Sequence, residues 1–287
     1  MINLFSFFSF HLFCYSYMFL FFFSMNFFLK NELIVLSYNI RYDNPNDGEN
    51  QWKYRKERIA SYIKEISPDI IGMQEVLESQ LIFLDVSLKE FSYVGVGRED
   101  GKTKGEYSPI LYNSNRLALL QTDTFWLSET PSVISVGWDA TLERICTYAQ
   151  FEHKKTGQKF WVFNTHFDHI GELARIQSAK LIHEKIKILN LNNFPVIITG
   201  DFNLSPNTTP IKILQNAYMD VMQKTSTDAK NHGTFTGFNK LSTGEDRIDY
   251  IFQKGFKMLE ATHVWLKTTS GGWASDHHPV EATFSFN

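Results

Sequence analysis

The sequence has few cysteines and no excess of positive charge, and each shortage excludes a class of protein. Two cysteines among 287 residues, Cys14 and Cys146, cannot build a disulfide framework or a cysteine-based zinc site. The formal net charge of −3 at pH 7 gives no support to a surface built for tight binding of nucleic acid. Cys146 lies in an alternating apolar stretch and is most simply a small buried hydrophobic residue.

The first 29 residues contain no Lys, Arg, Asp or Glu, and they hold 11 of the 26 phenylalanines. Three interpretations stay open for this Phe-rich segment, residues 1–30. A membrane-spanning helix fits its length, since roughly 20 apolar residues cross a bilayer. A secretory signal would need a positive start and a small-residue cleavage site, which the segment lacks. In the third interpretation translation starts at Met25 and the protein is cytoplasmic. We favour the third, with membrane anchoring through residues 1–29 as its alternative.

From residue 31 to residue 287 the sequence shows no linker, repeat or low-complexity tract, and it predicts one domain of strands and helices. Apolar positions with a period near 3.6 predict helices over Trp52–Ile66 and Glu172–Leu189. The residues of the second helix that we expect to face the core are Leu173, Ile176, Ile182, Ile186 and Leu189. Short apolar runs predict strands over 33–38, 70–73, 109–112, 159–164, 195–199, 247–252 and 280–286.

Polar residues with metal-binding or acid–base chemistry recur at the edges of these apolar strands. The set comprises Asn39, Glu75, His166, Asp201, Asn203, Asp249, Asp276 and His277. Strand ends on a rigid sheet are places where a site can be assembled from distant segments. Each of these residues alone could be an ordinary turn or cap residue, but their recurrence at one strand after another predicts a shared active site.

Six short motifs carry a resemblance to a known superfamily. They are Ser37-Tyr38-Asn39-Ile40, Met73-Gln74-Glu75, Asn164-Thr165-His166, Thr199-Gly200-Asp201-Phe202-Asn203, Arg247-Ile248-Asp249-Tyr250 and Ser275-Asp276-His277. In this order they resemble the motifs of the endonuclease/exonuclease/phosphatase superfamily, the deoxyribonuclease I-like metal-dependent phosphoesterases. The resemblance implies an α/β fold, a four-layer sandwich of two face-to-face, mainly antiparallel sheets flanked by helices.

The resemblance also implies a Mg²⁺-dependent hydrolase that cleaves a phosphodiester or phosphomonoester by direct attack of an activated water. Asn39, Glu75 and Asp276 would hold Mg²⁺, with Mn²⁺ as a substitute, because hard oxygen ligands suit both ions. The residues that would act in catalysis are His166, Asp201, Asn203, Asp249 and His277.

Each catalytic residue takes a separate role by this resemblance. Asp201 would orient and deprotonate the attacking water, and Asn203 would hold the nucleophile or a phosphate oxygen. His277 would donate to the phosphoryl oxygen that gains charge, while Asp249 would accept from the other nitrogen of that ring. His166 would be a second donor on the phosphate side.

Residues beside the motifs keep more than one interpretation. Arg144 either faces the cleft and binds phosphate or forms a structural ion pair. Asp168 and His169 contact substrate or a second metal, or they are loop residues. We expect His278 to point away from the site. Arg41 occupies a position that is acidic in some members of the superfamily, which favours one tightly held metal ion over a symmetrical pair.

The partner implied by the resemblance is a phosphoester substrate: nucleic acid, nucleotide, sugar phosphate or lipid phosphoester. The lack of clustered Lys and Arg near the motifs argues against tight binding of duplex nucleic acid. We infer no obligate protein partner, and the substrate stays open. The alternative from another class is a catalytically inactive binding protein that retains the fold, which predicts losses among the catalytic residues.

Overall fold

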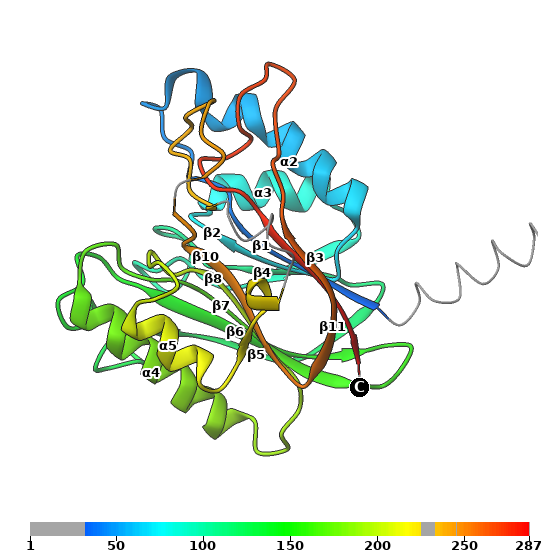
Figure 1. Ribbon diagram of the computed structural model, residues 1–287, viewed down its shortest axis with the longest axis vertical. Helices are drawn as coiled ribbons and strands as arrows, with labels where there is room; N and C mark the ends of the chain where they lie inside the picture. The colour runs from blue at the N-terminus through cyan, green and yellow to red at the C-terminus, as the bar shows by residue number, and fades with distance from the viewer. Residues whose placement is uncertain (1–31, 225–232, 245, 287) are drawn as a thin grey trace, which may run out of the picture. The chain divides into compact units, whose positions relative to one another are not determined.

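Two six-stranded sheets form the framework of the computed structural model, which describes residues 32–224, 233–244 and 246–286 (Figure 1). The first sheet contains, in spatial order, β11 (Phe256–His263), β12 (Val280–Phe286), β1 (Glu32–Asn39), β2 (Ile70–Gln74), β4 (Ile110–Asn113) and β3 (Phe91–Val94). The second contains β5 (Leu117–Trp126), β6 (Ile145–His153), β7 (Lys159–His166), β8 (Val196–Asp201), β10 (Asp249–Lys254) and β9 (Met219–Asp220).

Most neighbouring strands in these sheets run antiparallel. The pairs β1–β2 and β7–β8 are parallel. The pairs β11–β12, β2–β4 and β3–β4 in the first sheet are antiparallel, and so are β5–β6, β6–β7, β8–β10 and β9–β10 in the second. The predicted sandwich of mainly antiparallel sheets is therefore confirmed, with a parallel pair inside each sheet.

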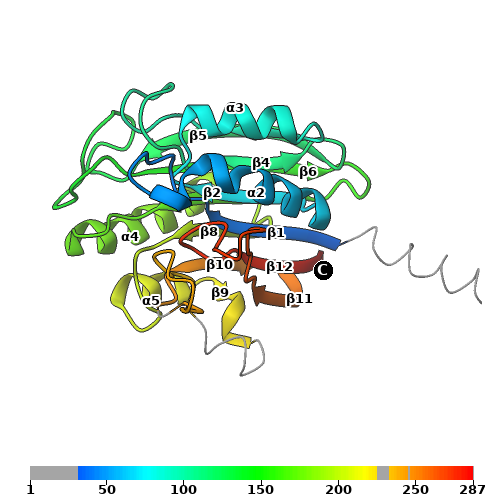
Figure 2. The ribbon, with the colours of Figure 1, turned by 90° about the horizontal axis from the view of Figure 1, so that it is seen from above.

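Helices cover the outer face of each sheet (Figure 1, Figure 2). The helices of the described residues are α2 (Trp52–Ile66), α3 (Glu78–Ser87), α4 (Glu172–Leu189) and α5 (Thr209–Gln215), with short 3-10 helices η2 (Gly48–Asn50) and η3 (Val221–Lys224). Apolar residues of α2 and α3 share one buried cluster with β1 and β2, whereas those of α4 and α5 share another with β7 and β8. A third cluster lies between the two sheets. These are the four layers that the resemblance implied.

The alternation of side chains along β1 explains why the strand contributes residues to two buried clusters. Leu33 and Val35 belong to the cluster between the sheets, whereas Leu36 and Tyr38 belong to the cluster beneath α2. Successive residues of a strand point to opposite faces, so a strand buried on both faces reads as a continuous apolar run. The segment 33–38 has this composition, which is why it predicted a strand.

Buried polar side chains join the two sheets close to the predicted site. Asn164 Nδ2 on β7 donates to the carbonyl oxygen of Met73 at 2.7 Å, and Gln74 Nε2 donates to Asn164 Oδ1 at 2.7 Å. The N–H of Gly200 donates to Ser37 Oγ at 3.0 Å. Because buried polar groups require partners, these hydrogen bonds hold β1 and β2 of the first sheet in a defined position against β7 and β8 of the second.

Gly72 on β2 permits this close approach. A Cβ atom at Gly72 would collide with Thr199 Oγ1 and lie 2.6 Å from Asn164 Oδ1. We therefore expect Gly72→Ala to lower the free energy of unfolding by about 1–3 kcal/mol, as overpacked cores typically do. Urea denaturation measures this change. Gly272→Ala is the matched control, because the nearest atoms to its Cβ would be 3.7 Å away. Equal stability of the two variants would contradict the close approach.

The boundaries of both predicted helices are confirmed, but the second helix differs from its prediction at two residues. Ile176 is only half-buried and lies outside the cluster beneath α4. Leu173 does not face the core; it is 46% exposed. The core-facing residues of α4 are Ala174, Ser178, Ala179, Ile182 and Ile186. The first turn is held by a polar contact instead, since the Asp139 carboxylate accepts the N–H groups of Leu173 and Ala174. A carboxylate at a helix N-terminus satisfies donors that apolar packing cannot.

The Phe-rich segment lies outside the described residues, so its boundary with the domain 31–287 stays a prediction. Among the residues that the structure describes, no helix is long and apolar enough to cross a membrane. The predicted localisation, cytoplasmic with translation from Met25 or membrane-anchored through residues 1–29, is therefore corrected: no described helix provides a membrane anchor, and residues 1–29 lie outside the described chain.

Candidate active site

The fold brings the predicted polar residues to one cavity of about 630 Å³. Those that line it are Glu75, His166, Asp201, Asn203, Asp276 and His277. Asn39 and Asp249 are fully buried behind this lining. Asn39 Nδ2 donates to Glu75 Oε1 at 3.0 Å, and Asp249 Oδ2 lies 2.9 Å from His277 Nδ1. All eight residues therefore belong to one contiguous cluster.

The register of the strands explains why these side chains meet. In the parallel pair β7–β8 His166 lies opposite Asp201, and in the antiparallel pair β8–β10 Asp201 lies opposite Asp249. In the first sheet Asn39 lies opposite Gln74. Residues opposite each other on neighbouring strands point to the same face, so the ends of several strands present polar groups to one space.

Three residues around the cavity have a left-handed backbone conformation, which residues other than glycine rarely adopt. They are Arg41, Glu75 and Asn203, with φ of 57°, 59° and 51°. Such conformations cost free energy and persist where neighbours hold them. The N–H of Asn203 donates to Asp201 Oδ1 at 2.9 Å, and the carbonyl of Arg41 accepts from Gln80 Nε2 at 3.0 Å. The left-handed backbone turns these three side chains into the cavity.

Arg55 is a positioning residue that the motifs do not include. It lies among Lys53 and Lys56 on α2, yet it is 1% exposed. Its guanidinium donates to the carbonyl oxygens of Ile40 and Ala274, both at 2.8 Å. These two carbonyls flank the segments that carry Asn39 and the Ser275-Asp276-His277 motif, so Arg55 holds two parts of the site together. Sequence periodicity places a basic residue on a helix but cannot show which backbone carbonyls it serves.

His277 is held as a charged hydrogen-bond donor. Its Nδ1 lies 2.9 Å from Asp249 Oδ2, and its Nε2 lies 3.7 Å from Asp201 Oδ2. Burial alone would lower the pKa of His277, but the carboxylates of Asp249 and Asp201 raise it well above the ordinary value. The imidazolium form carries a proton on both nitrogens, so the Nε2–H is directed at the acidic groups of the cavity.

Asp201 has the environment of a general base. Its Oδ2 accepts from Asn39 Nδ2 at 3.0 Å and its Oδ1 accepts the N–H of Asn203. Burial and the neighbouring Asp249 carboxylate raise the pKa of Asp201 to about 7. A carboxylate whose pKa approaches the operating pH takes up a proton more readily than an ordinary aspartate does.

His166 is neutral in this arrangement. Burial and the Arg144 guanidinium lower the pKa of His166 well below its usual range. Its Nε2 lies 3.0 Å from Asn203 Nδ2, which can only donate, so the proton of His166 resides on Nδ1. This Nδ1 is buried and has no hydrogen-bond partner among the described residues, and it lies 3.8 Å from Glu106 Oε2. An unpaired buried donor beside the cavity suits a substrate acceptor.

The donor set fits a hard divalent cation. One carboxylate oxygen each of Glu75 and Asp201 and a ring nitrogen of His277 lie within 4.8 Å of one another, and the Asp276 carboxylate also lines the cavity. The charged His277 ring has no free lone pair, so the ligands for a cation are the oxygens. Asn39 turns its Nδ2 toward the carboxylates, and a half-turn of the amide would present its oxygen instead. Carboxylate and amide oxygens are ligands of Mg²⁺ and Mn²⁺. The cysteine of the described chain, Cys146, is buried in the apolar core, as predicted.

Arg41 places a fixed positive charge beside these carboxylates. Its Nη1 lies 3.7 Å from Glu75 Oε2, and its Nε lies 3.8 Å from Asp276 Oδ2. Asp47 holds the guanidinium at 3.0 and 3.1 Å, and the Tyr42 ring lies beneath it at 4.4 Å. The charge of Arg41 partly neutralises Glu75 Oε2 and Asp276 Oδ2, which is consistent with one tightly held metal ion. The number of metal ions stays a prediction.

The residues beside the motifs separate into cavity-lining and supporting groups. Arg144 forms the predicted ion pair with Asp168 at 3.4 Å and also lines the cavity, whereas its binding of phosphate stays a prediction. Asp168 accepts backbone N–H groups of its own loop, whereas His169 lines the cavity, with its Nδ1 3.1 Å from Arg144 Nη2. His278 packs against Trp273 at 4.6 Å and is absent from the described lining.

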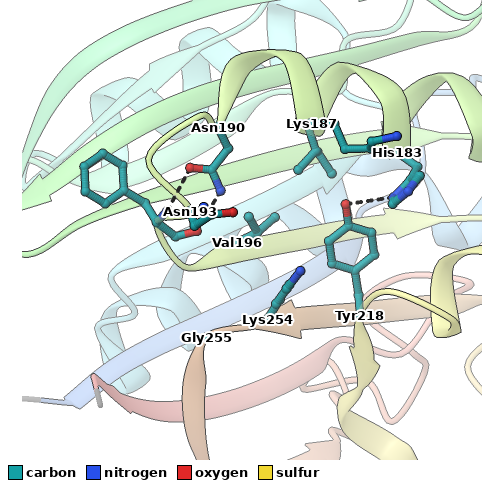
Figure 3. Close-up of a pocket in the computed structure, with 10 residues that line it drawn as sticks. His183, Lys187, Asn190, Asn193, Val196, Tyr218, Lys254 and Gly255 are labelled. Atoms are coloured by element: carbon teal, nitrogen blue, oxygen red, sulfur yellow. Dashed lines mark hydrogen bonds between the residues drawn. The ribbon is translucent and has the colours of Figure 1, made fainter.

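A second, smaller cavity of about 160 Å³ lies at the C-terminal end of α4 (Figure 3). His183 Nδ1 and the Tyr218 hydroxyl face each other there at 3.2 Å, with Lys187 and Lys254 nearby. No carboxylate is found among its described lining residues, and it shares none of them with the larger cavity. The negative end of the α4 dipole disfavours an anion at this place. The predicted chemistry is therefore confined to the larger cavity.

Comparison with known proteins agrees with this geometry. The Endonuclease/Exonuclease/phosphatase family matches residues 36–277. An endonuclease/exonuclease/phosphatase from Bacteroides vulgatus is 38% identical, with a TM-score of 0.82, over 89% of this chain and 99% of that one. The mannosyl-6-phosphatase of Bacteroides thetaiotaomicron VPI-5482 is 37% identical, with a TM-score of 0.83, over 88% of this chain and 100% of that one. An uncharacterised protein of Acanthamoeba polyphaga mimivirus is 32% identical over 217 residues, which are 70% of this chain and 80% of the relative. The chain belongs to the endonuclease/exonuclease/phosphatase family.

Proposed function

We propose that this protein hydrolyses a phosphomonoester by direct attack of water and that it depends on Mg²⁺, with Mn²⁺ as a substitute. The observation that carries the proposal is the approach of Glu75, Asp201 and His277 within 4.8 Å at the floor of the cavity. This cluster combines oxygen ligands, a base and a charged donor, which are the groups that phosphoester hydrolysis requires. The similarity to a mannosyl-6-phosphatase favours a phosphomonoester over a phosphodiester.

In the proposed reaction Asp201 takes a proton from water while Asn203 keeps the water in line. The water oxygen forms a bond to phosphorus as the bond from phosphorus to the alcohol oxygen breaks. The alcohol oxygen leaves with the electron pair and takes a proton from solvent, and Asp201 returns to solvent the proton that it took, so phosphate and a free alcohol result. Glu75, Asn39 and Asp276 would hold the divalent cation, which supplies positive charge to the phosphate oxygens when bound.

The two histidines act on the phosphoryl group. His277 donates from Nε2 to the oxygen that gains charge in the transition state, and Asp249 keeps the ring oriented and protonated through the 2.9 Å contact at Nδ1. His166 donates from Nδ1, which has no other described partner. Arg144 adds positive charge from the cavity wall.

The alternative of an inactive binding protein predicts that catalytic residues have been lost or displaced. His166, Asp201, Asn203, Asp249 and His277 are present, and each contacts at least one other member of the group. A binding protein would have no need of the charged His277–Asp249 pair next to a buried Asp201. This observation favours the enzyme.

Phosphate release by the full chain tests the proposal. The substrates are a hexose 6-phosphate, glycerol 3-phosphate, adenosine 5′-monophosphate, a generic phosphodiester and single-stranded RNA, each with Mg²⁺ or with Mn²⁺. We expect turnover of at least one phosphomonoester that exceeds turnover of the diesters. Cleavage of RNA or of the diester in preference to every monoester would contradict the proposal.

The neighbouring histidines provide a matched pair of variants. We expect His277→Ala to lower kcat by about 100-fold or more, since removing one transition-state donor typically costs 10²–10³-fold. His278→Ala should leave kcat within a few-fold of wild type, because its ring packs against Trp273 outside the described lining. Steady-state kinetics on the best substrate compares them. A larger loss for His278→Ala than for His277→Ala would mean that the two roles are exchanged.

A further inference from the structure

A row of three side chains extends outward from His277 along the cavity wall. Phe235 forms an isolated antiparallel bridge with His277 on one side and with Asp246 on the other. The N–H of Phe235 donates to the Asp246 carbonyl at 3.0 Å. Residues directly opposite in an antiparallel pair point to the same face, and all three line the cavity. The order along the wall is therefore His277, Phe235 and Asp246.

Two members of this row are unused by the proposed chemistry. The Phe235 ring lies 5.0 Å from the His277 ring, inclined by 62°, and the residue is 39% exposed. The Asp246 side chain is exposed and makes no hydrogen bond or ion pair with the described residues. An open aromatic face therefore adjoins the phosphoryl donor, and a carboxylate that is unpaired among the described residues lies one strand further outward. Leu142 and Ile248 are aliphatic residues that also line the cavity.

We propose that Phe235 and Asp246 form the subsite for the alcohol part of the substrate and that this part is a sugar ring. The proposal rests on the phosphomonoester hydrolysis proposed above. An aromatic face packs against the C–H face of a sugar, and a carboxylate accepts strong hydrogen bonds from neighbouring hydroxyl groups. Two strand spacings place the backbone of Asp246 roughly 10 Å from that of His277. One phosphorylated sugar ring spans such a distance.

The charges of the cavity favour a sugar over a nucleic-acid strand. A strand requires free cations that follow successive phosphates. The guanidinium groups among the described lining residues, Arg41 and Arg144, already pair with Asp47 and Asp168, and the charged His277 ring pairs with Asp249. Asp246 adds an unpaired negative charge to the wall and would repel a second phosphate. A neutral, hydroxyl-rich leaving group meets no such repulsion.

The test is the ratio of kcat/KM for mannose 6-phosphate to kcat/KM for glycerol 3-phosphate, which has no ring. This ratio does not depend on the fraction of folded enzyme. We expect wild type to favour the sugar by at least about tenfold, as one hydrogen bond to a charged group would produce. Phe235→Leu and Asp246→Ala should each move the ratio toward one, mainly through KM. Tyr93→Leu and Asp85→Ala are the controls, because these exposed side chains on β3 and α3 lie outside the described lining.

Different results would contradict the sugar subsite and the proposed phosphomonoester hydrolysis. A wild-type ratio near one, or a ratio that neither Phe235→Leu nor Asp246→Ala changes, would overturn the sugar subsite. A higher kcat/KM for adenosine 5′-monophosphate than for the sugar phosphate would also overturn it and would indicate stacking of a base on Phe235. Hydrolysis of neither mannose 6-phosphate nor glycerol 3-phosphate would contradict the proposed function instead.

Discussion

Asp201→Asn is expected to lower kcat by about 10²–10⁴-fold on every substrate, because a positioned general base contributes a factor of this size. Asparagine has nearly the same shape as aspartate, and its oxygen can accept the hydrogen bond that the Asn203 N–H now donates to Asp201 Oδ1. The amide cannot take a proton from water. We therefore expect a folded variant that still binds the divalent ion but turns over slowly.

The measurement for Asp201→Asn is single-turnover hydrolysis at saturating Mg²⁺, compared with the thermal stability of the same preparation. Asp123→Asn on β5 serves as the matched control, since this exposed carboxylate accepts only a neighbouring backbone N–H. Retained turnover in Asp201→Asn would mean that another group takes the proton. Loss of fold rather than of turnover would leave Asp201 as a structural residue.

Glu75→Ala is expected to abolish turnover and to weaken binding of Mg²⁺ or Mn²⁺ by at least about tenfold, since even residues that only orient a ligand contribute 10–100-fold to metal affinity. The Glu75 carboxylate accepts from Asn39 at 3.0 Å and from the N–H of Tyr42 at 3.2 Å, so both of its oxygens are fixed in place. Alanine removes the oxygen ligands and leaves these donors unpaired.

Isothermal titration with Mn²⁺ measures the binding lost in Glu75→Ala without relying on activity. Glu78→Ala is the control, because Glu78 lies three residues further along the chain and is exposed in the first turn of α3. An unchanged affinity in Glu75→Ala, or full activity when Mg²⁺ is added, would refute its role as a ligand. A similar loss in Glu78→Ala would point to a general effect of negative charge.

The sequence predicted the framework of this fold from local signals. The boundaries of α2 and α4 follow from apolar positions at helical spacing, and β12 (Val280–Phe286) from simple alternation. Leu173 was misplaced because periodicity identifies an apolar face but cannot show where the sheet beneath it ends. There the Asp139 carboxylate holds the first turn of α4.

The candidate site could be predicted in part, because its residues stand in recognisable motifs at strand ends. Within those motifs, however, Ser37, Gln74 and Asn164 join the two sheets through buried hydrogen bonds rather than facing the cavity. A motif cannot separate residues of the two kinds, since Ser37 and Asn39, like Asn164 and His166, are two residues apart and point to the same face of their strand. Their position along the strand decides whether they lie inside the sandwich or at the cavity. The role of Arg55 depends on Ala274, which lies 219 residues away along the chain. The role of Phe235 depends on His277, which lies about forty residues away. Only the fold brings such partners together.

Removal of the divalent ion with a chelator, followed by its return, tests whether hydrolysis requires a metal ion at the cluster of Glu75, Asp201 and Asp276. Initial rates of phosphate release from mannose 6-phosphate or glycerol 3-phosphate would be recorded for the full chain after treatment with a chelator and during titration with Mg²⁺. We expect the rate to fall to background in chelator and to return saturably with Mg²⁺ in wild type, but not in Glu75→Ala. An undiminished rate in chelator, or equal recovery in Glu75→Ala, would contradict a divalent ion held at this cluster.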